Sequence, residues 1–319
     1  MNIAQLARKF GQAIMPVRIS VSDVNEILGE PERAALQNSS FWVASAENSA
    51  PGKMLDLEFV ARTDVGRVRD HNEDYLGYSS PATPAQVRTH GWLFVLADGV
   101  GGHEKGEVAS KTAVESVVAG FPNAKDGESH SALLQRLVQQ ANTSVFETAV
   151  MGGREHAGMA TTIVACALRY DRVSVAHVGD SRCYLIRNGK AAQITRDHTV
   201  VGEQVRLGIL TAQEAAEGET SHILSRSLGT ELIANVDVND HQIFAGDVLL
   251  LCSDGLHGSV DASEMAAVCG LGQDLHLAAD KLVALANDRG GGDNISVQLI
   301  RIRAVERMGM YRGRPYKLY

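Results

Sequence analysis

Four acidic residues lie in glycine-bearing loops at the ends of expected strands, where their side chains could do chemistry. They are Glu73, Asp98, Asp254 and Asp293. The apolar run 93–97 is followed by Asp98-Gly99 and the run 248–252 by Ser253-Asp254-Gly255, and such runs bounded by turn residues are typical of buried strands. We therefore expect these strand ends to converge at one edge of the core and to bring the four carboxylates together.

Carboxylates that converge in this way need positive charge between them. Two like charges about 4 Å apart repel by about 4 kcal/mol at an effective dielectric constant of about 20. Either several of the acids are protonated or cations lie among them. Oxygen ligands suit Mg²⁺ or Mn²⁺, whereas Zn²⁺ prefers histidine and cysteine. Gly99 lets the backbone approach closely enough for its carbonyl to serve as a further ligand.

Two hard cations in such a site indicate a hydrolytic reaction. Metals about 3.5 to 4 Å apart can bridge a water molecule, lower its pKa and direct it at phosphorus. Arg69 lies in the same loop as Glu73, and its planar guanidinium matches phosphate oxygens. The sequence thus indicates hydrolysis of a phosphate monoester by in-line attack of water, without a covalent enzyme intermediate.

Length and composition are those of a globular protein and exclude some classes of function. The chain has 319 residues, 45% of them hydrophobic and 21% charged, with a formal net charge of −8. This mildly acidic balance argues against a broad surface for nucleic acid or acidic membranes. The four cysteines form no CxxC pair, so we expect reduced thiols and no disulfides. Residues 1–15 lack a continuous apolar core, so we expect neither a secretory signal nor a membrane span.

Hydrophobic periodicity predicts strands and helices that position these acids. Residues 109–121 repeat at helical spacing with mostly small side chains that permit close packing on a sheet, whereas residues 79–90 are expected to form a surface connection. Asn188-Gly189 is a strong hairpin signal. The predicted strands are 55–61, 75–78, 93–97, 161–168, 173–178, 183–187, 191–195, 236–244, 248–252 and 295–302, and the predicted helices are 109–121, 134–149, 261–268 and 274–287.

The order of these elements predicts an α+β fold. Strands that follow one another in hairpins, with helices in pairs between them, favour antiparallel sheets covered by helices. We divide the chain into an N-terminal extension and linker (1–55), a catalytic domain (56–305) and a basic tail (306–319). Residues 197–230 are polar and lack a long apolar run, so we predict a flap there.

An ordered set of motifs supports this interpretation and identifies a family. The motifs are residues 63–66 with 69–74, 97–103, 158–162, 178–182, 197–198, 225–229, 252–256 and 293–296. In this order the sequence resembles the metal-dependent protein Ser/Thr phosphatases of type 2C, in their bacterial form, over about residues 56–303. The resemblance implies a four-layer α-β-β-α sandwich, two antiparallel sheets flanked by helix pairs, with a binuclear metal site at one end.

The resemblance also implies a role for each site residue. Asp98 bridges two Mn²⁺ or Mg²⁺ ions and is, with Arg69, assigned to catalysis; Arg69 binds the substrate phosphate. The other metal ligands implied are Glu73, the Gly99 carbonyl, Asp254 and Asp293. Asp74 is expected to orient the water on the metals, and Asn294 to support the ligands around it. Asp180 and Ser181 are expected to brace loops.

Two positions depart from the family pattern. Some members have a histidine two residues after the bridging acid, where this chain has Val100. We expect neither Val100 nor His103 to protonate the leaving group. Ala157 occupies the position from which bacterial relatives often bind a third metal, and only Glu155 and His156 lie nearby as substitutes. A third metal is therefore not expected, and His177, in an apolar strand, is interpreted as a core histidine.

The functional hypothesis is a cytoplasmic phosphatase that acts on phosphoserine and phosphothreonine in proteins and opposes a bacterial Ser/Thr kinase. Its expected partners are phosphoprotein substrates, including such a kinase and its targets, and a monomer is expected. A noncatalytic phosphoprotein-binding scaffold of the same fold remains the alternative. Hydrolysis of small phosphate esters or nucleotides is disfavoured because no P-loop or base-binding motif occurs.

Overall fold

The computed structural model describes residues 55–100, 104–125, 127–153, 158–211, 214, 223–270, 272–306, 308–311 and 314–317. Within these residues, ten strands form two antiparallel sheets, a short strand pairs at the edge, and two more form a separate hairpin. The strands are β1 (Leu55–Asp64), β2 (Asp74–Ser79), β3 (Trp92–Val100), β4 (Ala160–Thr161), β5 (Ile163–Arg169), β6 (Arg172–Val178), β7 (Arg182–Arg187), β8 (Lys190–Gln193), β9 (Asp237–Gln242), β10 (Val248–Cys252), β11 (Ile295–Val305), β12 (Met308–Tyr311) and β13 (Arg314–Lys317). The helices are α4 (Pro84–Thr89), α5 (Glu104–Gly120), the 3₁₀ turn η1 (Phe121–Asn123), α6 (His130–Met151), α7 (Val200–Arg206), α9 (Asp254–His257), α10 (Ala262–Val268) and α11 (Leu275–Asp288).

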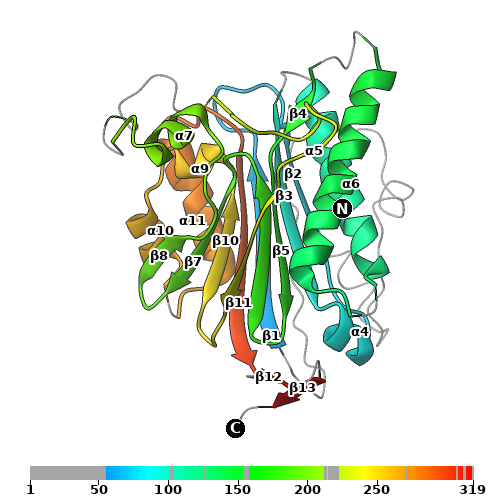
Figure 1. Ribbon diagram of the computed structural model, residues 1–319. Helices are drawn as coiled ribbons and strands as arrows, with labels where there is room; N and C mark the ends of the chain where they lie inside the picture. Colours follow the sequence, from blue (N-terminus) through cyan, green and yellow to red (C-terminus); the bar gives the residue numbers. More distant parts are fainter. Residues whose placement is uncertain are drawn as a thin grey trace, which may run out of the picture. The chain divides into compact units, whose positions relative to one another are not determined.

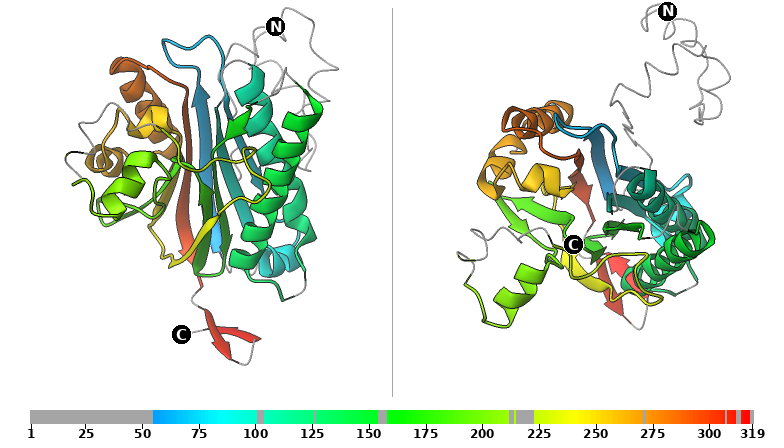
Figure 2. Two further views of the ribbon diagram at one scale, coloured as in Figure 1. Left: turned by 45° about the horizontal axis from the view of Figure 1, so that its top comes forward. Right: turned by 90° about the horizontal axis from the view of Figure 1, so that it is seen from above.

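The two sheets lie face to face between helices, as Figure 1 shows. One sheet has the order β1-β11-β10-β7-β8 and the other β2-β3-β5-β6-β9, with β4 paired to β3. Apolar side chains of both inner faces fill the space between the sheets. Helices α5 and α6 cover the outer face of the second sheet, and α10 and α11 that of the first (Figure 2). The predicted four-layer α-β-β-α sandwich is confirmed.

Antiparallel register brings distant segments to one end of the sandwich. Asp64 at the end of β1 is opposite Ile295 at the start of β11. Asp74 at the start of β2 is opposite Asp98 on β3. Because β10 also pairs with β11 and ends at Cys252, it delivers the following segment to this same end. The expected convergence of loops therefore follows from strand pairing.

Several local predictions were wrong or incomplete. The expected surface connection 79–90 contains α4, which begins after Thr83 because the Thr83 hydroxyl accepts a hydrogen bond from the Gln86 amide. The predicted strand 161–168 is interrupted at Thr162, whose backbone and hydroxyl both bind Asp98 instead. The basic tail contains the β12–β13 hairpin. The predicted N-terminal extension and linker (1–55) lies, except for Leu55, outside the described residues.

Polar and sulfur-containing residues are also built into the core. All four cysteines are buried thiols, and the sulfur atoms of Cys166 and Cys183 lie 3.5 Å apart between the sheets. His177 is fully buried, as expected of a core histidine. Among the described residues, no helix is long and apolar enough to cross a membrane.

His130 at the start of α6 makes the stability of the fold depend on pH. Its imidazole is buried, and Nε2 donates a hydrogen bond of 2.8 Å to the His90 carbonyl. Burial, and secondarily the charge of Arg169, lowers the pKa of His130 to about 4. The unfolded chain binds this proton at about pH 6.5, so between these values the unfolded state holds more protons than the folded state. Stability is therefore expected to fall as the pH drops through this window.

We predict that His130→Gln removes part of this dependence. Between about pH 6.5 and 4, the titration of His130 should lower the unfolding free energy of the wild type by up to about 3 kcal/mol. In the variant, the unfolding free energy should therefore fall less steeply with decreasing pH. Urea unfolding at pH 7, 6, 5 and 4.5 measures the difference. Val138→Ala, in the same helix, adds no titrating group and should keep the wild-type slope. Equal slopes in His130→Gln and wild type would contradict the assignment.

Candidate metal and phosphate site

Asp98 lies at the end of the sandwich where the loops converge, and its backbone is held from two sides. On one side the neighbouring Gly99 amide donates a hydrogen bond of 3.0 Å to the Glu73 carbonyl. On the other, the Thr162 amide and the Thr161 hydroxyl each donate to the Asp98 carbonyl at 2.8 Å, and the Thr162 hydroxyl accepts from the Asp98 amide at 3.0 Å. These bonds use only backbone groups of Asp98 and Gly99, so they fix the position of Asp98 without neutralising its carboxylate.

The acids of this end act on one another electrostatically. Burial is the main cause that raises the pKa of Asp98 well above its usual value, followed by the charges of Asp74, Asp254, Asp180 and Asp293. Burial likewise raises the pKa of Asp74, with Asp254 and Asp293 adding to the shift. Three of the four predicted acids, Asp98, Asp254 and Asp293, thus lie close enough for their charges to affect one pKa, that of Asp98.

Arg69 lies beside these acids, as expected. Its Nη2 donates a hydrogen bond of 2.6 Å to Asp293 Oδ2, and this bond is the main cause that raises the pKa of Arg69. The charges of Glu73 and Asp254 also favour its protonated form. Half of the arginine side chain, 49%, remains exposed, so an incoming anion can reach the guanidinium.

Asn294 connects three segments of the site. Its Oδ1 accepts a hydrogen bond of 2.8 Å from the Glu73 amide, and its Nδ2 donates to the carbonyls of Val65 and His71 at 2.9 and 2.8 Å. Because Asn294 is buried and follows Asp293 directly, it ties the loop that carries Arg69 and Glu73 to the start of β11.

Asp74 is held by the serine that precedes Asp254. The Ser253 hydroxyl donates to Asp74 Oδ2 at 2.8 Å and accepts from the Ser296 amide at 3.0 Å. The second carboxylate oxygen, Asp74 Oδ1, is buried and has no hydrogen-bond partner within the described residues. A buried carboxylate oxygen in that state is suited to face a cation or its water, because burial without a partner is otherwise costly.

Two expected bracing residues lie close to this centre. The Ser181 hydroxyl is 2.7 Å from that of Thr162, and the Asp180 carbonyl accepts a hydrogen bond of 3.1 Å from His257 Nε2. Burial, and then the charge of Asp254, raises the pKa of Asp180 to about 7. Ser181 thus contacts Thr162, which holds the Asp98 backbone, and Asp180 contacts His257 of α9.

The positions at which the chain departs from the family pattern are only partly described by the structure. Val100 lies at the end of β3 and is 41% exposed. Because this residue is valine, the position supplies no imidazole. His103 and the segment containing Glu155, His156 and Ala157 lie outside the described residues. The structure therefore leaves the expectations for those four residues as they stood.

A separate group of potential metal ligands lies under the predicted flap. His177, His198 and Asp237 offer ligand atoms within 4.8 Å of one another. However, the Arg226 guanidinium lies 3.1 Å from Asp237 and 3.3 Å from His198 Nε2, and that of Arg196 lies 2.9 Å from Asp237. Two arginines already neutralise the one carboxylate of this group, so we interpret it as an anchor of the flap.

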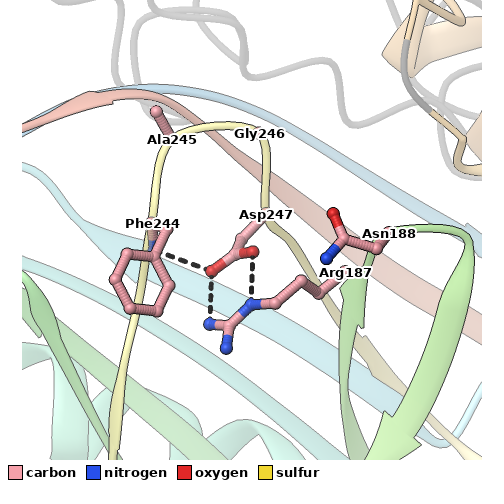
Figure 3. Close-up of a pocket in the computed structure, with 6 residues that line it drawn as sticks. All are labelled: Arg187, Asn188, Phe244, Ala245, Gly246 and Asp247. Atoms are coloured by element: carbon pink, nitrogen blue, oxygen red, sulfur yellow. Dashed lines mark hydrogen bonds and ion pairs between the residues drawn. The ribbon is translucent and has the colours of Figure 1, made fainter.

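A pocket of about 340 Å³ lies at the opposite end of β10 and does not contain the acids (Figure 3). Its lining residues are Arg187, Asn188, Phe244, Ala245, Gly246 and Asp247. Arg187 donates to both carboxylate oxygens of Asp247, at 2.8 and 2.7 Å, and its guanidinium lies 4.6 Å from the centre of the Phe244 ring. The positive charge of the pocket is thus satisfied within the protein, which makes it a poor site for phosphate.

Sequence reasoning missed the roles of Gly106 and of the two threonines around Asp98. Thr161 and Thr162 belong to a recognised motif, but their contacts with Asp98 depend on β4 pairing at the end of β3. Gly106 lies in the first turn of α5, in direct contact with Glu73. The helix predicted at 109–121 begins after Gly106, whereas α5 begins at Glu104; with that earlier start, a glycine in a helix, where it is intrinsically unfavourable, is the signal that could have identified it.

Comparisons with known proteins agree with this geometry. A family model described as protein phosphatase 2C matches residues 67–281. The serine/threonine phosphatase stp of Listeria innocua is 36% identical over 256 residues, which cover 79% of this chain and 97% of that protein. The serine/threonine phosphatase of S. agalactiae superposes with a TM-score of 0.69 at 32% identity, covering 78% of this chain and all of that one. The catalytic domain of the phosphatase PstP, solved with two manganese ions, gives a TM-score of 0.64 at 33% identity, covering 77% and 98% of the two chains.

We predict that Asn294→Ala destabilises the protein by about 3 kcal/mol, because three backbone groups lose their partner and each buried hydrogen bond contributes about 1 kcal/mol. Urea unfolding of the metal-free protein measures this loss. Asn239→Ala, at an exposed position of β9, is the matched control and should change stability by less than about 0.5 kcal/mol. A loss at position 294 no larger than the control would refute the connecting role of Asn294.

Proposed function

The chain belongs to the protein phosphatase 2C family, and on that premise we propose that it is a metal-dependent phosphatase that removes phosphate from phosphoserine and phosphothreonine in proteins. The observation that carries the proposal is the set of mutually interacting acids around Asp98, with the half-exposed guanidinium of Arg69 beside them. The related chains named serine/threonine phosphatases support the choice of substrate class.

The residues present fit two divalent cations. The donor set proposed is Glu73, Asp98, the Gly99 carbonyl, Asp254 and Asp293, all oxygen ligands of the kind that Mn²⁺ and Mg²⁺ prefer. Burial and mutual repulsion raise the pKa of Asp98, so cations would replace the protons that these acids otherwise attract. The unpartnered Asp74 Oδ1 fits the same interpretation. When bound, the two cations supply a water molecule activated for attack on phosphorus.

The protein's own residues hold and orient the substrate. Arg69 already places Nη2 on Asp293, and this bond directs the guanidinium toward the acids. The guanidinium offers further N–H groups that match phosphate oxygens in a planar fork. Asp74, fixed through Oδ2 by Ser253, keeps Oδ1 available to accept a hydrogen bond from the attacking water. Residues from three separate loops thus bind the negative charge of the phosphate and orient the attacking water in line with phosphorus.

The biological setting of the proposal is dephosphorylation in the cytoplasm. We propose that the substrates are phosphoproteins, that they include a Ser/Thr kinase and its targets, and that the enzyme acts as a monomer. The four buried thiols agree with a reducing compartment. No feature of the described residues favours the noncatalytic scaffold over the enzyme, since the described acids and Arg69 lie together.

We predict that Asp254→Asn abolishes metal-dependent hydrolysis while the protein remains folded. Removal of one carboxylate from the proposed donor set should lower the rate by at least about 100-fold, since the loss of supporting groups alone costs about 10- to 100-fold. Hydrolysis of a phosphothreonine peptide in Mn²⁺, with circular dichroism as the folding check, measures this. A chelator should abolish wild-type activity equally. Asp288→Asn, at the exposed end of α11, is the control, and full activity in Asp254→Asn would remove the assigned site.

We predict that Arg69→Ala chiefly raises the KM for a phosphopeptide. A charge-assisted hydrogen bond to phosphate contributes about 1.5–3 kcal/mol, which corresponds to about a 10- to 100-fold rise. Arg69→Lys keeps the charge but loses the fork, so its KM should lie between those of the wild type and the alanine variant. Steady-state kinetics at saturating Mn²⁺ measures all three proteins. An unchanged KM in Arg69→Ala would count against phosphate binding by this residue.

A further inference from the structure

Helix α5 lies unusually close to the sheet because glycines face it. A Cβ atom added to Gly77 on β2 would lie 2.4 Å from Val114 Cγ1 of the helix. A Cβ atom added to Gly99 on β3 would lie 2.1 Å from the Gly106 carbonyl oxygen. Both distances are shorter than any contact that a real side chain makes, so α5 rests on the backbone of β2 and β3 (Figure 1). The small buried residues Ala109 and Ala113 continue this contact along the helix.

The first turn of α5 reaches the proposed metal ligands through Gly106. A Cβ atom on Gly106 would lie 2.4 Å from Glu73 Oε2, 2.8 Å from Glu73 Cδ and 2.9 Å from the Gly99 carbonyl oxygen. The three nearest atoms thus belong to two residues of the proposed donor set. Alanine is favoured over glycine inside a helix, so this glycine works against helix formation. The close contact with Glu73 and Gly99 gives a physical reason for its presence.

We propose that Gly106 is a positioning residue of the metal centre, whose missing side chain lets α5 close on the Glu73 carboxylate and the Gly99 carbonyl and hold both as ligands. This inference rests on the proposed function, because it takes Glu73 and Gly99 to be ligands. Glu73 is then confined from two sides. Asn294 fixes its backbone amide at 2.8 Å, and α5 limits where its carboxylate can go.

The two glycines of this contact differ in what a side chain would displace. At Gly99 the added atom would meet only backbone atoms, of Gly106 and Glu73, which cannot rotate away. At Gly106 the two nearest atoms are the end of the flexible Glu73 side chain, which can move, and only the third, the Gly99 carbonyl oxygen at 2.9 Å, belongs to the backbone. Gly106→Ala should therefore leave the fold intact and move the Glu73 carboxylate from its place.

The test is a double-mutant cycle read out by Mn²⁺ binding. Wild type, Gly106→Ala, Glu73→Ala and the double variant are titrated with Mn²⁺, with calorimetry and the electron paramagnetic resonance signal of free Mn²⁺ as readouts. Gly106→Ala should weaken Mn²⁺ binding by about 10- to 100-fold, the usual effect of losing a group that orients a ligand. In the Glu73→Ala background, Gly106→Ala should weaken Mn²⁺ binding by less than about twofold more, because the carboxylate that it displaces is already absent. Saturating Mn²⁺ should restore most of the kcat of Gly106→Ala.

Controls separate the possible failures. Gly270→Ala, where the nearest atom would be 3.5 Å away, should bind Mn²⁺ as the wild type does. Wild-type Mn²⁺ affinity in Gly106→Ala, or an equal loss in both backgrounds, would overturn the positioning role. If Gly106→Ala unfolds, the melting temperatures of the metal-free single and double variants are compared instead. A higher melting temperature in the double variant than in Gly106→Ala supports the proposal, and an equal one overturns it. Wild-type Mn²⁺ binding in Glu73→Ala would instead refute the ligand assignment of the proposed function.

Discussion

Repulsion among the carboxylates at one end of the sandwich is the constraint on which the site depends. Burial, and then the charges of Asp74, Asp254 and Asp293, raises the pKa of Asp98. A fold that packs negative charges together loses stability unless protons or cations enter. The sandwich tolerates this arrangement because its core between the sheets and under both helix layers is large and apolar. Stability from the core thus permits an unfavourable but chemically useful site.

The protein holds the acids mainly through their backbones. Thr161 and Thr162 bind the amide and carbonyl of Asp98, and Asn294 binds the amide of Glu73. Bonds of this kind fix position and leave the carboxylate charge for another partner. Arg69 is different, because it pairs directly with the Asp293 carboxylate. In the proposed phosphatase this pairing keeps the phosphate-binding group next to the metals, so substrate and cations meet at a common point.

Much of this arrangement could be predicted from the sequence because it depends on local signals. The apolar run before Asp98 and that before Asp254 predicted the strands, and antiparallel hairpins then implied that the strand ends meet. The interruption at Thr162 could not be predicted, because an apolar, β-branched segment gives no reason for a strand to break. The break arises from Asp98, which is 64 residues away in the sequence and takes the hydrogen bonds of Thr162.

The role of Gly106 is likewise visible only in three dimensions. Small residues in the segment 109–121 correctly predicted close packing of a helix on a sheet, but not which atoms would meet at its first turn. That meeting requires β2, β3 and α5 to be placed together, since Glu73 precedes β2 and Gly99 lies on β3. Sequence periodicity determines which face of a helix is buried. How closely the helix backbone approaches the sheet depends instead on the smallest residues where the two meet. Where that distance must accommodate a proposed metal ligand, glycine fits the contact with Glu73 even though it disfavours the helix.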